Sequence, residues 1–499
     1  MKSNIIPLEN GFNKKISVLG FGHFNTIHPG HIRYLRYAKK KKGIFAIALI
    51  GDGFSKDNQN YNFNQKERAE ALNLLSIVDY IFTLKDSELD MAVKNLKPEV
   101  LILGNEFEKT TEESIKNAVV IQNQEKRNTT YYGGQIIYAS TDLLISSEID
   151  LDRKRKMQFR STCIKTGLNK VKLLNSLNQW KNSKLIVLGD TIVDQYAACE
   201  ALGISAEAPV VVVKELETKN FIGGAAIVAS HIKALGAQCD FISVVGHDEN
   251  AKLIEEEIFN QNIGCHLIRD NSRPTTFKKR YIVENQKLFR VSKLEDHSID
   301  EKIELEIIKK LKMLAPNAQG IVISDFVYGL ITKRIISVIK ELAKKYNLLL
   351  FGDLQCSSQV GSILKFKNFS LLCPNEREAR LAMGDKDSGL ELLSQKLIEK
   401  TSSERLIMKL GAEGFISYER LKSGNVESHP FPALTVNPLD VTGAGDSLLA
   451  AMSSGLSSGQ KMMETSALGC CIAGLAVTTM GNSPINKNNL ENFVEDIFL

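Results

Sequence analysis

A short loop near the C-terminus combines a carboxylate with small residues in a pattern suited to phosphate chemistry. The loop reads Asp440-Val-Thr-Gly-Ala-Gly-Asp446 and leads directly into an apolar run. Gly443, Ala444 and Gly445 let the backbone approach a ligand closely, and at the start of a helix their N–H groups favour an anion. A carboxylate repels a phosphate there unless it takes a proton from the attacking hydroxyl. The pattern therefore indicates either a phosphoryl-transfer site with Asp446 as base, or a glycine-rich turn with Asp446 as a helix cap.

These seven residues resemble the catalytic loop of the PfkB/ribokinase family of sugar kinases. The resemblance implies that Asp446 is the general base and that the amides of Gly443, Ala444 and Gly445 form an anion hole. It extends over about residues 183–495. The family's Asn-x-x-Glu motif, which influences binding of Mg²⁺ and phosphate, is matched by Asn375-Glu-Arg-Glu378. The stretch at 406–411 is expected to form a strand and a turn beside the adenine nucleotide, which places Lys409 and Gly411 in nucleotide binding.

The start of this C-terminal region carries groups suited to a sugar. An apolar strand at 185–188 ends in Gly189-Asp-Thr-Ile-Val-Asp194, and carboxylates at such a place can accept hydrogen bonds from sugar hydroxyls. We expect Asp194 to contact the substrate, whereas Asp190 could instead be a cap. Gly223 and Gly224, which open a helix, would let backbone amides touch a sugar without obstruction.

Several stretches resemble, more narrowly, the kinase half of the bifunctional heptose kinase/nucleotidyltransferases, which make ADP-activated heptose. The resemblance implies that Lys278, Arg280 and Arg290 can hold a phosphate of the acceptor. The chain departs from that family where basic or polar residues are usual, at Gly203, Ile227, Tyr328 and Gln355. Since a phosphate needs positive partners, we expect an acceptor other than the standard heptose 7-phosphate.

A second candidate site lies in the N-terminal third. His28 and His31, separated by Pro29-Gly30, follow an apolar strand at 16–19 and stand where a basic amphipathic helix at 32–42 begins. Imidazoles at such a place can donate to phosphate oxygens and offset charge that develops during transfer. Metal ligation is the alternative, but it lacks a third ligand at suitable spacing.

The stretch from Gly22 to His31 resembles the His-x-Gly-His motif of the cytidylyltransferase-like nucleotidyltransferases, over about residues 15–145. Asn25 replaces the Asp that is usual there, which keeps a hydrogen-bonding side chain but loses a charge. The resemblance implies that the transferred nucleotide is bound by Gly22, Phe24, His28, His31, a triphosphate-binding Lys56, a phosphate-contacting Arg68, and Ser140 and Thr141 of a closing Ser-Thr motif.

Strands and helices alternate along the chain and predict an α/β fold in two domains. Residues 1–150 are expected to form a doubly wound parallel sheet with its ligand at the carboxyl ends of the strands. Residues 151–180 are expected to be a linker, with a solvated basic run at 152–156 and a connecting helix at 171–180. The resemblance implies a ribokinase-like α/β domain with a small β lid over residues 181–499. In the bifunctional family the kinase usually comes first, whereas here it comes second.

Composition sets limits on partners and location. The 499 residues suffice for two or three domains, and a net charge of +5 gives little reason to expect nucleic acid. No apolar stretch reaches the roughly 18 residues of a membrane span, and the N-terminus lacks a signal-peptide core. Eight cysteines without metal-ligand spacing suggest buried thiols in the cytoplasm. A homodimer is possible.

The expected function is therefore two consecutive Mg²⁺-dependent steps. ATP phosphorylates a sugar at its anomeric hydroxyl, and the N-terminal domain joins the sugar phosphate to a nucleotide with loss of pyrophosphate. One alternative is a CTP-dependent first site that acts on an alditol or amino-alcohol phosphate. Another is that one half is degenerate and serves as a sensor.

Overall fold

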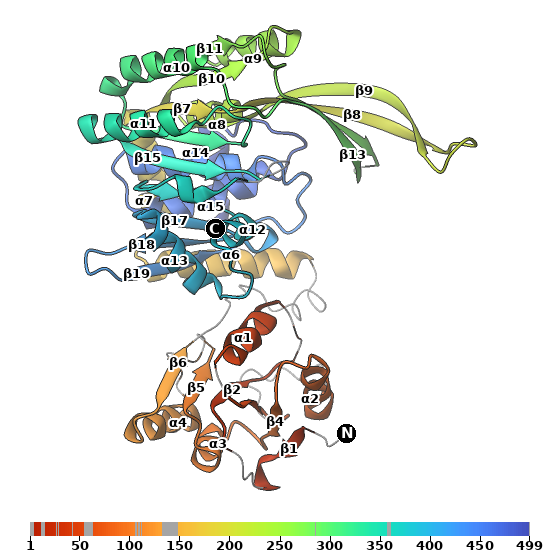
Figure 1. The fold of residues 1–499 in the computed structure, drawn as a ribbon, viewed down its shortest axis with the longest axis vertical. Coiled ribbons are helices and arrows are strands. Elements are labelled where there is room, and N and C mark those ends of the chain that lie inside the picture. The colour runs from red at the N-terminus through yellow and green to blue at the C-terminus, as the bar shows by residue number, and fades with distance from the viewer. Residues whose placement is uncertain are drawn as a thin grey trace. The chain divides into compact units, whose positions relative to one another are not determined.

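The computed structural model describes residues 4–498 except 11–14, 26, 28, 42, 54–62, 105–106, 108–109, 111, 132–147, 285 and 357–360. The chain forms two compact units. The first contains Met1–Ser147 with Asp385–Leu393, and the second contains Glu148–Gly384 with Ser394–Leu499. Both are α/β units (Figure 1), in agreement with the predicted fold class.

The first unit is built on a parallel sheet with the strand order β1-β4-β3-β2-β5-β6. β2 lies inside the sheet, with β3 and β4 added on one side of it and β5 and β6 on the other. The sheet is therefore doubly wound, and its switch point lies between β2 and β5. The strands are β1 (Ile5–Pro7), β2 (Val18–Gly22), β3 (Phe45–Leu49), β4 (Tyr80–Thr83), β5 (Val100–Leu103) and β6 (Asn128–Tyr131).

Two separate apolar clusters cover the two faces of this sheet. Leu35 and Leu72, from α1 and α2, belong to one cluster, and Val93 and Ile115, from α3 and α4, belong to the other. These helices are α1 (Pro29–Lys39), α2 (Gln65–Leu74), α3 (Leu89–Leu96) and α4 (Glu113–Gln124). The strand predicted at 16–19 and the helix predicted at 32–42 correspond to β2 and α1, each displaced by about three residues.

The second unit has a central nine-stranded sheet with the order β11-β10-β7-β14-β15-β16-β17-β18-β19. It is parallel except at β17-β18 and β18-β19. The strands are β7 (Lys184–Gly189), β10 (Gln238–Val245), β11 (Gly264–Arg269), β14 (Gly320–Asp325), β15 (Leu349–Leu354), β16 (Leu371–Leu372), β17 (Arg405–Lys409), β18 (Phe415–Arg420) and β19 (Val426–Phe431).

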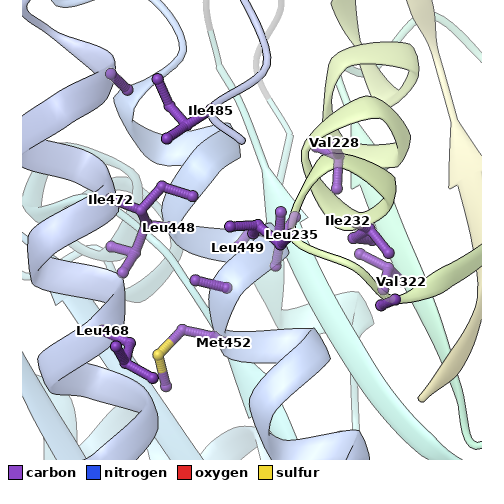
Figure 2. Packing of buried hydrophobic residues seen from close by; sticks show 14 of the residues in the cluster. Val228, Ile232, Leu235, Val322, Leu448, Leu449, Met452, Leu468, Ile472 and Ile485 are labelled. Carbon is purple, nitrogen blue, oxygen red and sulfur yellow. The ribbon is translucent and has the colours of Figure 1, made fainter. Parts of the chain in front are cut away.

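Helices with buried apolar stripes pack on this sheet. The central pair is α8 (Ala225–Ala234) and α14 (Ala444–Ser457), and α14 also packs against α15 (Met462–Ala476). Figure 2 shows the side chains that fill the space among them, including Val228, Ile232, Leu235, Leu448, Leu449, Met452, Leu468 and Ile472. Further helices are α7 (Lys170–Gln179), α9 (Glu249–Asn260), α10 (Glu301–Leu314), α11 (Lys333–Tyr346), α12 (Glu376–Met383) and α16 (Lys487–Phe498). Helix α13 (Leu390–Thr401) begins in the segment assigned to the first unit and continues into the second.

A four-stranded lid sheet, in the order β13-β12-β8-β9, completes the second unit. Its strands are β8 (Thr191–Ile204), β9 (Val211–Gly224), β12 (Phe277–Val283) and β13 (Gln286–Lys293). In Figure 1, β8 and β9 form a long ribbon that extends away from the central sheet of their unit. Residues 206–209 form the bend that joins β8 to β9.

The expected linker has more structure than the sequence suggested. Residues Glu148–Lys165 form helix α6, which packs against β19 and α16 of the second unit. Phe159 and Cys163 are fully buried in the core of that unit, and Arg155, from the basic run expected to be solvated, is only 6% exposed. Apolar residues are too sparse in the sequence of α6 for a helical period to be recognised there. Among the described residues, the structure has no helix with the length and apolarity that a membrane crossing requires.

Candidate active sites

A cavity of about 610 Å³ in the second unit brings most of the predicted kinase residues together. It lies where the loop before α14 meets the ends of the central strands and the base of the lid sheet. Its walls include the following predicted residues: Asp194, Gly224, Lys278, Arg280, Arg290, Asn375, Glu378, Lys409, Gly411, Gly443, Ala444, Gly445 and Asp446. Gly223, the remaining residue predicted for this unit, does not line it.

Asp446 lies in the first turn of α14 and is 5% exposed. One of its carboxylate oxygens accepts a hydrogen bond from Gln355 Nε2 at 2.8 Å. Burial raises the pKa of Asp446 to about 7, and the nearby Asp353 carboxylate adds to this, while Lys409 and Gln355 act in the opposite direction. A carboxyl group with a pKa near neutrality can take up a proton at the pH of the cell.

The glycine-rich turn before Asp446 has the backbone geometry of an anion-binding site. Gly443 is the N-cap of α14 with φ of +84°, and a Cβ atom at that position would lie 1.9 Å from Asn482 Oδ1. A Cβ at Gly445 would lie 3.4 Å from Lys409 Nζ. The start of a helix, a glycine in the left-handed conformation and an ammonium group therefore meet at one point of the cavity.

Lys409 comes from the end of β17 and is held by Asp353 at the end of β15. Its ammonium group donates to both Asp353 oxygens, at 2.8 and 2.9 Å. Burial opposes the charge on Lys409, but the carboxylates of Asp353 and Glu378 outweigh this and raise its pKa. The lysine therefore stays charged beside the turn. Asp353 was not singled out from the sequence, although a carboxylate at the end of an apolar strand, as at Asp194, was the signal for it.

Asn375 and Glu378 form a capping box at the start of α12. The Asn375 side chain accepts from Glu378 N–H, and the Glu378 carboxylate accepts from Asn375 N–H, both at 2.8 Å. The second Glu378 oxygen accepts from Cys356 N–H at 3.2 Å, and burial raises the pKa of the carboxyl. Across the described part of the chain, no three His, Cys, Asp or Glu side chains gather as a metal site.

The other end of the cavity carries the groups predicted for the sugar. Asp194 is 4% exposed and forms an ion pair with Arg280 of β12. Lys278 of the same strand is buried with its ammonium group 5.1 Å from the Phe326 ring centroid. At Gly223 a Cβ would meet an Asp194 oxygen at 2.6 Å, so Gly223 makes room for this carboxylate without itself lining the cavity.

Asp440 connects the glycine-rich turn to the lid sheet, which the sequence did not reveal. Its carboxylate accepts from Tyr196 Oη of β8 at 2.7 Å and from Lys287 Nζ of β13 at 2.6 Å. Burial opposes the charged form, but these hydrogen bonds outweigh it and lower the pKa of Asp440 to about 2. The pKa values of the two carboxyl groups in this loop are therefore shifted in opposite directions. Asp440 is ionised at neutral pH, whereas the pKa of Asp446 lies close to neutral pH.

The rest of the cavity wall is mostly apolar. It is formed by the turn after β17, the segment after β19 and one side of α15. This wall includes Ala412, Phe415, Pro432, Leu434, Val436, Cys470, Ala473 and Val477. A flat, apolar ring system fits such a wall, while charged groups fit the opposite end.

In the first unit, the described part of the predicted site lies at the switch point. Gly22 ends β2, Phe24 is buried, and the Phe24 and His31 rings lie 4.9 Å apart. Tyr34 of α1 was not predicted. Its hydroxyl donates to Ile102 O of β5 at 2.6 Å and accepts from Phe21 N–H of β2 at 3.0 Å.

Arg68 is fully buried in the first unit and joins the loops that follow β2 and β3. Its guanidinium donates to His23 O at 2.5 Å, to Ile50 O at 3.0 Å and to Asp52 Oδ1 at 2.7 Å. The structure thus gives Arg68 a role in holding these loops, and its contact with phosphate stays a prediction. Of the other predicted residues, His28, Lys56, Ser140 and Thr141 lie outside the described residues.

Two family models match the chain. The model for the pfkB family carbohydrate kinases matches residues 182–488, and a cytidylyltransferase-like model matches residues 19–167. The kinase match covers more than half of the chain, together with the whole lined cavity. The chain therefore belongs to the pfkB family of carbohydrate kinases, and it carries a cytidylyltransferase-like region before the kinase.

Curated relatives point in the same direction. The chain is 28% identical over 317 residues to the Bifunctional protein HldE of a Nitratiruptor species. This alignment covers 63% of this chain and 65% of the relative. The chain is 31% identical over 321 residues to the protein of the same name from Helicobacter hepaticus. This second alignment covers 63% of this chain and 64% of the relative. The chain thus spans less than two thirds of the length of these relatives.

Solved structures resemble the second unit in fold. Phosphofructokinase-2 from Escherichia coli, in complex with substrates and products, aligns with a TM-score of 0.53 and 14% identity over 63% of this chain and 99% of that chain. Ribokinase from Giardia lamblia aligns with a TM-score of 0.50 and 16% identity over 62% of this chain and 99% of that chain. At such identities the likeness shows the ribokinase-like fold alone.

Proposed function

We propose that the chain is a bifunctional enzyme that makes a nucleotide sugar in two steps. In the first, the anomeric hydroxyl of a sugar attacks the γ-phosphorus of ATP, giving a sugar 1-phosphate and ADP. In the second, an oxygen of the sugar phosphate attacks the α-phosphorus of a nucleoside triphosphate, giving the nucleotide sugar and pyrophosphate. The two matched families and the similarity to proteins named HldE support this sequence of steps.

In the kinase step, Asp446 accepts the proton of the attacking hydroxyl as the bond to phosphorus forms. The amides of the 443–445 turn and the Lys409 ammonium group offset charge on the transferring phosphoryl oxygens. Asp194 and Arg280 orient the sugar from the lid side of the cavity. The opposite apolar wall receives the adenine, which places the γ-phosphate between the two ends.

Mg²⁺ fits this site as a partner of the ATP phosphates. Both Glu378 oxygens accept backbone hydrogen bonds and retain further acceptor capacity toward the cavity. This suits an indirect role for Asn375 and Glu378 through water, because Mg²⁺ keeps several waters and takes few protein ligands when phosphates are present. The ion, when bound, neutralises charge on the phosphates.

In the nucleotidyl step, no base is needed, because a sugar phosphate is already ionised at neutral pH. His28, His31, Lys56, Arg68, Ser140 and Thr141 would then need only to bind the triphosphate and offset its charge, with Gly22 and Phe24 shaping the loop. The second nucleotide is ATP or CTP, and an ADP-sugar is favoured by the similarity to the bifunctional heptose enzymes.

The acceptor is proposed to be heptose-like but not the standard heptose 7-phosphate. Gln355 donates to Asp446, and Tyr328 is buried beside Lys278, so neither position supplies a cation to the sugar end. Ile227 is fully buried in the core and does not line the cavity, so this position contributes no contact to the sugar. Lys278, Arg280 and Arg290 remain as the cations at this end.

Apolar side chains exposed along the lid sheet support the proposal of a homodimer. They lie on the ribbon of β8 and β9 and on β13, and they include Leu202, Ile204, Val211, Leu216, Phe289 and Val291. A long ribbon with such a surface is a ready site for self-association. We place both reactions in the cytoplasm, where nucleoside triphosphates are available and thiols such as the eight free cysteines stay reduced.

The convergence of Asp446, the glycine-rich turn and Lys409 in one cavity is the observation that carries this proposal. The test is to mix purified protein with Mg²⁺, candidate sugars and each nucleoside triphosphate, and to identify products by mass. We expect a sugar 1-phosphate and then a nucleotide sugar. Equal concentrations of heptose 7-phosphate and unphosphorylated sugars test the acceptor. A wide preference for heptose 7-phosphate would contradict the proposed change, and a lack of any phosphorylated sugar would contradict the kinase assignment.

A further inference from the structure

Arg155, on the helix that follows the first unit, reaches the wall of the kinase cavity. It is 6% exposed, and its Nη1 group donates to Thr435 O at 2.7 Å, while Nη2 donates to Ala412 O at 3.4 Å. The residue thus joins two backbone segments that lie more than twenty residues apart in the chain. It belongs to a basic run that composition alone assigns to a solvated surface.

Both acceptors of Arg155 belong to the apolar end of the cavity. Ala412 lies in the 3-10 turn Gly411–Glu413 between β17 and β18, and Thr435 lies in the segment after β19. Both residues line the cavity. The Thr435 hydroxyl also donates to Gly474 O of α15 at 2.8 Å, so this segment is held from two sides.

We infer that Arg155 is a positioning residue for the nucleotide of the kinase reaction. The inference rests on the proposed function, because it takes the apolar end of the cavity as the place of the adenine. A carbonyl that is fixed by a hydrogen bond fixes the plane of its peptide unit. Arg155 therefore sets which backbone atoms of the Ala412 and Thr435 segments face the base, and it sets the width of the gap between them.

The chemistry of arginine suits this task. Its planar guanidinium presents several donors in a fixed geometry, so one side chain can satisfy two carbonyls at a set separation. A lysine has one ammonium group on a flexible chain and cannot hold both segments in the same way. The sugar end, with Asp194 and Lys278, lies on the lid side of the cavity and does not depend on these two carbonyls.

The test compares Arg155→Met and Arg155→Lys with Arg160→Met in the full-length protein. Arg160 is the matched control, because it lies on the same helix and donates to a backbone carbonyl, that of Ile497 in α16, which does not line the cavity. For each variant, KM for ATP, KM for the sugar and kcat are measured. The shift of the melting temperature by ATP or ADP with Mg²⁺ is measured as well.

For Arg155→Met we expect the KM for ATP to rise about tenfold, in keeping with the loss of charge-assisted hydrogen bonds. The sugar KM and kcat should change little, the nucleotide-induced melting shift should shrink, and Arg155→Lys should be intermediate. Arg160→Met should keep wild-type nucleotide constants. Wild-type values in both Arg155 variants, or an equal rise in Arg160→Met, would overturn the inference. If Arg155→Met fails to fold, Arg155→Lys decides alone.

The melting shift separates this inference from the proposed function. Should the wild-type protein phosphorylate none of the sugars, the proposed kinase reaction fails, but binding of ATP or ADP can still be followed. A smaller shift in the Arg155 variants alone would then still support the positioning role. An unchanged shift would reject it independently of turnover.

Discussion

The two units each place a loop at the start of a helix near the carboxyl ends of parallel strands, but they support these loops differently. The loop before α14 has a carboxyl group with a pKa raised to about 7, an ionised Asp440 and a charged Lys409. At the start of the loop before α1, the buried Arg68 guanidinium donates to His23 O and also to Ile50 O after β3. The Tyr34 hydroxyl ties the end of β2 to β5 by accepting from Phe21 N–H and donating to Ile102 O.

This difference follows the chemistry proposed for each site. A hydroxyl acceptor must lose a proton, so the kinase site needs a group whose charge can change during the reaction. A sugar phosphate is already a nucleophile, so the nucleotidyl site needs fixed donors and no proton acceptor. The comparison therefore predicts that changes of proton affinity affect one reaction, and changes of scaffold hydrogen bonds affect the other.

The largest effect is expected for Asp446→Asn. The amide keeps the shape of the side chain but cannot take the proton, so sugar phosphorylation should fall by about 10²–10⁴-fold. Nucleotidyl transfer from supplied sugar 1-phosphate should be unchanged. Both rates are measured on the same preparation, and the melting temperature serves as a check on folding. Near-normal phosphorylation would show that Asp446 is not the general base.

His31→Ala is the converse half of the comparison. His31 packs near Phe24 at the start of α1, and its loss should remove most nucleotidyl transfer while sugar phosphorylation continues. The measurement is release of pyrophosphate alongside formation of ADP. A folded His31→Ala variant that loses both activities would contradict the independence of the two sites.

Gly445→Val is expected to have the next largest effect. A Cβ at this position lies 3.4 Å from Lys409 Nζ, so the branched methyl groups of valine would enter the space between the turn and the ammonium group. Phosphorylation should fall by about 100-fold, or about 2.7 kcal/mol in transition-state stabilisation. Initial rates at saturating ATP measure this effect. A rate close to wild type would mean that the turn does not contact the phosphoryl group.

The pH dependence should differ between the two reactions. Because burial raises the pKa of Asp446 to about 7, the base is protonated below that pH, and kcat/KM for phosphorylation should be about tenfold lower at pH 6 than on its plateau. Nucleotidyl transfer should not show this acidic limb of the pH profile, the fall in rate below about pH 7. Gln355→Leu removes a hydrogen bond that lowers the pKa, so the limb should move to higher pH. A flat profile for phosphorylation would rule out Asp446 as the titrating base.

The sequence predicted the parts of this comparison that depend on local patterns. The strand ends, the glycine-rich turn and the carboxylate at 446 could be located because each has a local signature. Pairings between distant segments could not, since no period or spacing marks the contact of Lys409 with Asp353 or of Asp440 with Tyr196. The burial of Arg155 could not be predicted for the same reason, because its partners lie more than 250 residues away in the chain.

Tyr34 tests the hydrogen-bonded scaffold of the nucleotidyl site, and its substitution is expected to have the smallest effect. The pairing of β2 with β5 ends at Gly20 and Ile102, and beyond it the Tyr34 hydroxyl bridges Phe21 N–H to Ile102 O. Tyr34→Phe leaves this buried donor and acceptor without the hydroxyl, at a cost of about 1–3 kcal/mol in the stability of the first unit.

The two activities report this cost separately when the protein is heated. Nucleotidyl transfer should be lost at a lower temperature in Tyr34→Phe than in the wild type. Below that temperature its rate should already be a few-fold lower, because the end of β2, from which the loop starts, loses its link to β5. Phosphorylation should keep its wild-type rate and its inactivation temperature. Tyr37→Phe, on the same helix but partly exposed, is the control and should change neither. Equal losses of both activities in Tyr34→Phe would mean that the two loops share their support, and the contrast between a titrating site and a fixed scaffold would not hold.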